Sequence, residues 1–121
     1  MFASTITLTL NSIAKVLNRN NQDNGGSRYW YKSATESIEL LIRHSVDNPT
    51  PKTGQVMYRH NVFVERVIFA TPTTIERRYT FTATIRESYA SDPLESGYLA
   101  AAVTAWLGTS TNEADLIAGI N

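Results

Sequence analysis

The spacing of apolar residues changes once along this chain, near Arg86, and this change restricts the possible folds more than any other feature. Before it, apolar and polar residues mostly alternate, which is typical of β-strands with one buried face. After it, apolar residues recur at intervals of three and four, which is typical of helices. The order of the two patterns predicts an α+β fold in which a sheet comes first and helices follow.

The sheet-forming part divides into strands at residues that favour turns. Residues 4–10 alternate threonine with isoleucine and leucine, and they are predicted to form an N-terminal hairpin with residues 13–17. The polar residues 18–27 are predicted to be a loop. Further strands, rich in aromatic and β-branched residues, are predicted at residues 28–32, 37–46, 54–70 and 74–86. Proline-containing segments separate the last three of these strands, because proline has no backbone donor.

A first helix is predicted after the sheet. Asp92, Pro93 and Glu95 occupy the positions of an N-cap, a first-turn proline and a capping-box glutamate, and Gly108 is predicted to end the helix. Apolar residues recur along it at helical spacing: Leu94, Tyr98, Leu99, Val103, Trp106 and Leu107.

A second, shorter helix is predicted from Ser110, because Ser110 and Glu113 have the spacing of a capping box. A chain of 121 residues suits one domain. We therefore predict a single domain over residues 1–121, with a hairpin at 1–18, a sheet at 28–86 and helices at 92–120.

Charge is distributed unevenly along the chain although the net charge is zero. Residues 1–86 contain all eleven Lys and Arg and six of the eleven Asp and Glu, a formal charge of +5. Residues 87–121 contain the other five acids and no Lys or Arg, a formal charge of −5. A basic sheet suggests a polyanionic partner, and a chance division of charge over a solvated surface is the alternative.

The two faces of the predicted sheet differ in polarity. If the helices cover one face, alternation places Ile38, Leu40 and Ile42 on it and polar residues on the other. Arg28, Trp30 and Lys32 belong to this polar face, where six basic residues are expected beside three acids. Cations can contact phosphates and an indole can stack on an unpaired base, so the face suits single-stranded RNA. An ordinary solvated sheet face is the alternative.

The composition argues against catalysis, metal binding and membrane insertion. The chain has no cysteine, and His44 and His60 are too few for a zinc site, so we expect them in the core or an interface. No nucleophile elbow or phosphate-binding glycine loop is present, and we expect no cofactor. No apolar run approaches the roughly 20 residues that span a bilayer, so a soluble, intracellular product without a membrane partner is expected.

The strand predicted at residues 54–70 is longer than usual, so we expect it to bend or to cross a subunit boundary. The apolar C-terminal helices are expected to clasp a second copy of the chain. A monomer whose helices fold back on their own sheet is the alternative.

Five short stretches and the order of hairpin, sheet and helices carry a family resemblance over nearly the whole chain. The stretches are Ala14-Lys15-Val16-Leu17, Asn21-Gln22-Asp23, Ile42-Arg43-His44, Gln55-Val56 and Tyr58-Arg59-His60-Asn61-Val62. In these features the chain resembles the coat proteins of single-stranded RNA bacteriophages (leviviruses), particularly their Caulobacter-phage branch. A cellular α+β binding module or small enzyme with a polar sheet face is the alternative.

The resemblance implies an architecture of an N-terminal hairpin, a five-stranded antiparallel sheet and two helices. It also implies an interlocked homodimer with a continuous ten-stranded sheet. Such dimers would close an icosahedral shell around genomic RNA in the virion, after assembly in the cytoplasm of the bacterial host, without catalysis. The dimer interface would be formed by Leu94, Tyr98, Leu99, Val103, Trp106 and Leu107.

The resemblance further implies that the inner surface of the sheet binds an RNA hairpin and thereby represses translation. Matching strand positions assigns this surface to Arg43, Ser45, Arg59, Asn61, Arg78, Thr80 and Thr82. Together with Arg28, Trp30 and Lys32 these residues form the predicted RNA site. The segment 70–74 would correspond to the family's loop around the openings of the shell.

Overall fold

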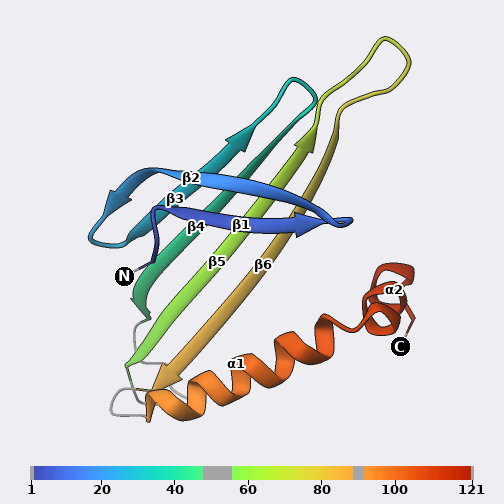
Figure 1. The fold of residues 1–121 in the computed structure, drawn as a ribbon. Coiled ribbons are helices and arrows are strands. Elements are labelled where there is room, and N and C mark those ends of the chain that lie inside the picture. Colours follow the sequence, from blue (N-terminus) through green and yellow to red (C-terminus); the bar gives the residue numbers. More distant parts are fainter. Residues whose placement is uncertain (1, 48–55, 89–91, 121) are drawn as a thin grey trace.

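The computed structural model describes residues 2–47, 56–88 and 92–120 (Figure 1). Six antiparallel strands precede two helices, and each strand pairs with the next along the chain. The strands are β1 (Thr5–Leu10), β2 (Ile13–Asp23), β3 (Gly26–Lys32), β4 (Glu36–Asp47), β5 (Met57–Ile68) and β6 (Arg77–Ser88). The helices are α1 (Pro93–Leu107) and α2 (Ser110–Ala118). The predicted order of hairpin, sheet and helices is confirmed.

The second strand of the hairpin is longer than we predicted. Residues 18–27 were expected to be a loop, but β2 continues to Asp23 and β3 begins at Gly26. A register shift between Arg19 and Asn21, typical of a β-bulge, interrupts the pairing with β3. Before the shift β2 crosses the sheet together with β1, and after it β2 becomes the fifth strand beside β3 to β6 (Figure 1). The polar sequence misled the prediction, because a solvated strand needs backbone pairing and not apolar side chains.

The other strand boundaries differ less from the prediction. Asn11 and Ser12 form the predicted hairpin turn, with φ values of 49° and 64° that match the type I′ turns of short hairpins. β5 has 12 residues, the same number as β4 and β6, so the bounds predicted at residues 54–70 are too wide and β5 is no longer than its neighbours. Residues 54 and 55 lie outside the described part. The length of β5 therefore gives no reason to expect it to cross a subunit boundary.

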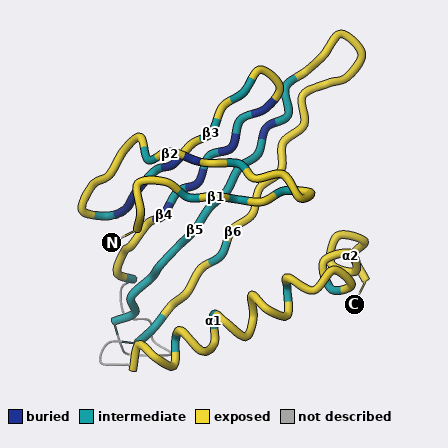
Figure 2. Tube along the Cα trace, viewed as in Figure 1, coloured by how far each residue is buried: buried dark blue, intermediate teal, exposed yellow. Residues whose placement is uncertain are grey.

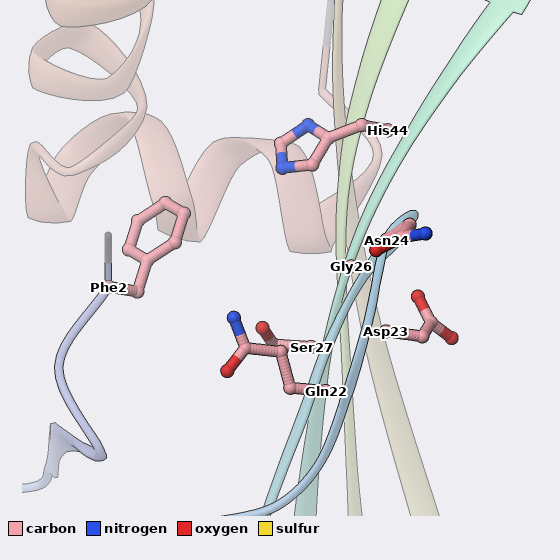
Figure 3. Close-up of a pocket in the computed structure, with 7 residues that line it drawn as sticks. All are labelled: Phe2, Gln22, Asp23, Asn24, Gly26, Ser27 and His44. Carbon is pink, nitrogen blue, oxygen red and sulfur yellow. The ribbon is translucent and has the colours of Figure 1, made fainter.

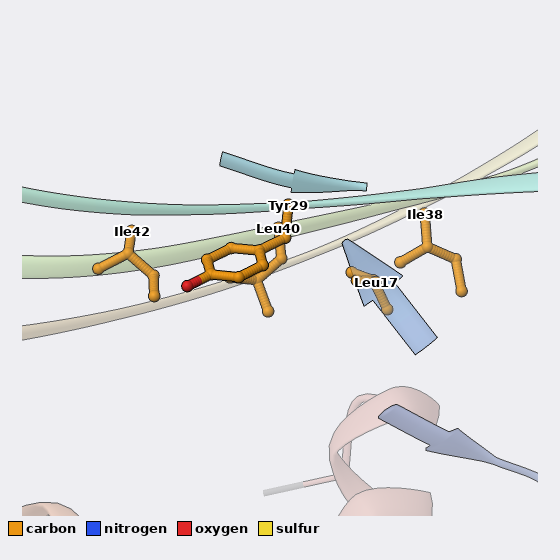
Figure 4. Packing of buried hydrophobic residues seen from close by; sticks show 5 residues of the cluster. All are labelled: Leu17, Tyr29, Ile38, Leu40 and Ile42. Carbon is orange, nitrogen blue, oxygen red and sulfur yellow. The ribbon is translucent and has the colours of Figure 1, made fainter. Parts of the chain in front are cut away.

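The buried core lies where the hairpin crosses β3 and β4. Leu17 on β2 and Tyr29 on β3 have no exposed surface, and the Tyr29 hydroxyl donates a hydrogen bond to the carbonyl oxygen of Ala3 at 2.8 Å. The cluster comprises Leu17, Tyr29, Ile38, Leu40 and Ile42 (Figure 4). Ile6, Leu8 and Leu10 on β1 pack against it from the hairpin.

A buried carboxylate joins the hairpin to the sheet. Glu36 at the start of β4 accepts from the Lys15 ammonium on β2 and from Nε of Arg66 on β5, both at 2.8 Å. The Glu36 side chain is only 7% exposed. The hydrogen bond from Lys15 is the largest cause that lowers the pKa of Glu36, and it outweighs the opposing effect of burial. Three strands are thus held together through one charged group.

The two helices begin and end at polar or small residues. Asp92 is the N-cap of α1 and accepts from the backbone N–H of Leu94 at 3.0 Å, and Gly108 is its C-cap, as predicted. The N-cap of α2 is Thr109 and not Ser110, so the predicted capping box at Ser110 is wrong. Thr109 has an extended backbone directly after Gly108, and helical geometry therefore begins one residue earlier than the sequence pattern indicated.

Neither helix has a buried residue in a single chain. α1 begins beside the end of β6 and its other end lies away from the sheet (Figure 1). Buried residues are confined to the strands, whereas the helices are almost entirely exposed (Figure 2). The alternative of helices folded back on their own sheet is therefore wrong for the chain by itself. Neither described helix is long and apolar enough to cross a membrane.

A close approach of β3 and β4 requires glycine at position 26. A Cβ atom at Gly26 would overlap the backbone carbonyl of Ile42, whereas one at the neighbouring Gly25 would make only ordinary contacts. We therefore expect Gly26→Ala to lower the free energy of unfolding by roughly 1–3 kcal/mol, as overpacking does. Urea denaturation of Gly26→Ala and of the control Gly25→Ala checks this. If both variants lose the same free energy of unfolding, the close approach at Gly26 does not require glycine.

The Glu36 contacts predict a stability change on the acid side. Since folding lowers the pKa of Glu36, its contribution is complete above the ordinary carboxyl pKa and is lost as the pH falls through the lowered value. We expect Glu36→Gln to reduce the free energy of unfolding at neutral pH by roughly 1–3 kcal/mol and to remove this part of the acid dependence.

Urea denaturation at neutral and acid pH, at one fixed protein concentration, measures both effects. Glu76→Gln is the control, because the Glu76 side chain is exposed and its only described ion pair, with Arg78, is long at 3.3 Å. A Glu36→Gln variant with the stability and acid dependence of the wild type would refute the assignment.

Candidate nucleic-acid interface

Strand register brings the predicted RNA-site residues onto one face of the sheet. Residues directly opposite each other in antiparallel strands share a face. One row across β4, β5 and β6 consists of Ser45, Arg59 and Arg86, and the adjacent row begins with Arg43 and Asn61. All ten predicted positions belong to this polar face: Arg28, Trp30, Lys32, Arg43, Ser45, Arg59, Asn61, Arg78, Thr80 and Thr82. The hairpin packs against the opposite face.

Most arginines on the polar face are paired with acids of the same chain. Four of the five arginines form such ion pairs: Arg28–Glu39 at 2.6 Å, and Arg43–Asp23, Arg78–Glu65 and Arg86–Asp47 at 2.8 Å each. Arg78 has a second, longer pair with Glu76 at 3.3 Å. Sequence parity gave three acids on this face and missed two others. Asp23 was in the predicted loop 18–27, and Asp47 follows the strand predicted at residues 37–46. Asp23 lies opposite Gly26, which lies opposite Arg43. The Arg43 hydrogen bond is the largest cause of the lowered pKa of Asp23.

Arg59 differs from the other arginines of the polar face. No ion pair of Arg59 is found among the described residues. Its Nε atom, like that of Arg28, is buried without a hydrogen-bond partner there. Arg59 lies on β5 between Ser45 and Arg86. A guanidinium without a carboxylate partner is free to form charge-assisted hydrogen bonds with a phosphate. Lys32, which is exposed, likewise forms no described ion pair.

Groups that can contact bases surround these cations. Trp30 is 43% exposed on the polar face, and an exposed indole can stack on an unpaired base. The Asn61 amide donates to Thr84 Oγ1 at 2.8 Å and to the Ala83 carbonyl at 3.3 Å, which leaves its oxygen as an acceptor. Leu41 and Phe63 are half-buried and interrupt the polar surface in one row. The face therefore combines cations, hydrogen-bonding groups and one stacking platform.

The two histidines lie opposite each other on the other face. Their Nδ1 atoms are 2.9 Å apart, and His60 Nε2 lies 3.1 Å from Glu87 Oε1. Glu87 also accepts from the Ser96 hydroxyl of α1 at 2.7 Å. In the single chain His44 is exposed and His60 half-buried, so neither lies in the core. Of the expected core or interface position, the interface stays a prediction. Within the described part of the chain, no three His, Asp or Glu side chains are arranged to hold a metal ion.

A polar pocket of about 490 Å³ lies beside His44, at the turn between β2 and β3 (Figure 3). It is lined by Phe2, Gln22, Asp23, Asn24, Gly26, Ser27 and His44. Its two titratable groups are Asp23 and His44, and Arg43 already occupies the Asp23 carboxylate. An active site needs a nucleophile or base oriented by further groups. This pocket gives no support to the small-enzyme alternative.

Comparison with known proteins supplies the family. The family model described as "Phage phiCb5, coat protein" matches residues 3–88. A solved structure described as "Bacteriophage EMS014 coat protein" has 17% sequence identity and a TM-score of 0.72, over 88% of this chain and 74% of that chain. A second solved structure, described as "Virus-like particle of bacteriophage AVE019", has 14% sequence identity and a TM-score of 0.65. The match covers 100% of this chain and 98% of that chain. No curated protein matches this chain.

The sheet followed by two helices is the fold that these coat proteins share with this chain. Fold and family together define a structural coat protein of RNA phage virions and not an enzyme. The chain belongs to the family of the phage phiCb5 coat protein.

Proposed function

We propose that this coat protein forms an interlocked homodimer, and that dimers assemble into an icosahedral shell that packages single-stranded RNA. The observation that carries the proposal is the apolar surface that one chain leaves uncovered. Leu94, Tyr98, Leu99, Val103 and Trp106 on α1 are each more than half exposed. Soluble proteins rarely expose contiguous apolar patches of more than a few hundred Å². A second copy is the partner that every such chain always has available.

The sheet offers complementary apolar surface to a partner. Tyr79 and Phe81 on β6 are more than half exposed on the hairpin side of the sheet. A groove of about 600 Å³ between β6 and the helices is lined by both residues and by Leu107, Leu116 and Ile117. Helices of a partner chain that enter this groove would bury apolar surface on both subunits, which stabilises association.

The exposed edge of the sheet supports the same arrangement. Among the described strands, β6 pairs only with β5, so its other edge presents backbone groups without a strand partner there. Antiparallel pairing of two β6 strands would join two sheets of five strands, each formed by the second half of β2 and by β3 to β6, into one of ten. A relative of the same fold is described as a virus-like particle, which supports assembly beyond the dimer.

The polar face supports a role in RNA packaging and in binding an RNA hairpin as a translational repressor. In the proposed dimer it lies on the side away from the helices, facing the interior of the shell. Arg59 and Lys32 supply cations without carboxylate partners, and Trp30 supplies a stacking surface. We propose the ten residues of the polar face as the RNA site and the apolar residues of α1 as the dimer interface, within a single domain.

Assembly is tested first by electron microscopy of the purified full chain. We expect closed particles of uniform size that contain nucleic acid. Only small species without RNA, under conditions where the chain is folded, would contradict the proposed shell.

A charge introduced on α1 should prevent dimerisation. We expect Val103→Glu to raise the dimer dissociation constant at least about thirtyfold, because two unpaired carboxylates at ~1–3 kcal/mol each would be buried. Sedimentation equilibrium measures this constant. The control is Ile75→Glu, since Ile75 is 81% exposed and lies in the segment between β5 and β6. If the wild type is a dimer and Val103→Glu has the same dissociation constant as Ile75→Glu, Val103 does not lie in the dimer interface.

Removal of Arg59 should weaken RNA binding. We expect Arg59→Ala to lower the affinity for an RNA hairpin and to reduce the slope of log K against log salt concentration by about 1. Arg77→Ala is the matched control, because Arg77 is exposed but has the parity of the opposite face. Fluorescence anisotropy at several salt concentrations provides both quantities. If Arg59→Ala and Arg77→Ala bind RNA with the same affinity and the same salt dependence, Arg59 is not part of the RNA site.

A further inference from the structure

Six basic side chains lie on the polar face, and four of them are already neutralised by acids of the same chain. We infer that Asp23, Glu39, Asp47 and Glu65 compete with RNA phosphates for these arginines and so confine phosphate binding largely to Arg59 and Lys32. The inference rests on the proposed RNA-binding function. Beyond that function, it identifies these four acids as the residues that limit sequence-independent binding of RNA.

Two of the pairs meet at the middle of the sheet. Glu39 on β4 and Glu65 on β5 lie directly opposite each other. Arg28 reaches Glu39 from β3, and Arg78 reaches Glu65 from β6 at 2.8 Å. Arg78 also lies 3.3 Å from Glu76, so that two carboxylates surround its guanidinium. This arrangement holds both arginines in ion pairs along the sheet.

The third pair depends on a glycine. Nη1 of Arg43 donates to both Asp23 oxygens, at 3.1 and 2.8 Å. Gly26 lies between Asp23 and Arg43 in the register, and it has no side chain to block the contact across β3. The lowered pKa of Asp23 is consistent with an ionised carboxylate held by this arginine.

The fourth pair crosses β5 and leaves Arg59 out. Arg86 on β6 donates to Asp47 on β4 at 2.8 Å, although its direct neighbour in the register is Arg59. Asp47 is thereby occupied by Arg86, and Arg59 has no described carboxylate partner. Six bases and five acids, Glu76 included, leave an excess of one positive charge per subunit on this face.

The pairs affect RNA binding more than stability. Exposed ion pairs of this kind contribute about 0–1 kcal/mol to folding. A phosphate that binds one of these arginines must displace the carboxylate, so little net charge is neutralised. Since sequence-independent affinity depends on the number of phosphates neutralised, the acids keep that affinity low.

The test uses the unassembled full chain and a short, fluorescein-labelled single-stranded RNA of mixed sequence. We expect Glu39→Gln and Asp23→Asn each to bind this RNA more tightly, because Arg28 and Arg43 have no second described carboxylate partner. Each variant should steepen the slope of log K against log salt concentration by about 1 for the arginine released onto a phosphate. Both variants should unfold at urea concentrations close to that of the wild type. Asp115→Asn, which removes an equal charge from α2, should leave the slope unchanged.

Arg43→Ala provides the reciprocal test, because an arginine that is already paired should contribute little. For Arg43→Ala, the slope of log K against log salt concentration should stay close to that of the wild type. For Arg59→Ala, the slope should decrease by about 1. The inference is overturned if the wild type binds RNA but neither Glu39→Gln nor Asp23→Asn changes the slope, or if Arg43→Ala loses as much of the slope as Arg59→Ala. A wild-type chain that binds neither this RNA nor an RNA hairpin contradicts the proposed RNA-binding function itself, and the inference with it.

Discussion

An antiparallel sheet of this kind must cover its apolar face, and the rest of the structure depends on how little of that face one chain covers. The hairpin buries Tyr29, Ile38, Leu40 and Ile42 where it crosses β3 and β4. Beyond the hairpin, Phe81 and its neighbours on β6 remain exposed, and the helices bury none of their own side chains. The chain therefore has a folded centre and an uncovered apolar half that suits association with a copy of itself.

Two local features allow the hairpin to cover its part of the sheet. The register shift after Arg19 lets one strand serve both the hairpin and the sheet edge. Glu36 then joins β2, β4 and β5 through Lys15 and Arg66. A buried carboxylate is tolerable here because two cations satisfy it. The covered half of the sheet is thus held by both apolar packing and one ionic junction.

The polar face shows why residue counts are a poor guide to binding. Eleven basic and eleven acidic residues give no net charge, and even the strongly basic sheet strands are largely balanced by acids on the same face. Which arginines keep an unpaired positive charge depends on their position in the sheet. Arg59 has no described carboxylate partner, whereas Arg43 has one. For a coat protein, this balance would favour a few defined RNA contacts over uniform attraction to any polyanion.

The sequence by itself determined the order of strands and helices, the hairpin turn and the face on which the residues of the predicted strands lie, because periodicity and turn preferences are local properties. It misjudged residues 18–27 and the N-cap of α2, which is Thr109 and not Ser110, since a solvated strand and an extended residue before a helix leave little trace in local patterns. Only the tertiary structure decided that Asp23 reaches Arg43 and that the helices stay off their own sheet. Both outcomes depend on strands and surfaces brought together across long stretches of sequence, and the energy of those contacts is absent from any local segment.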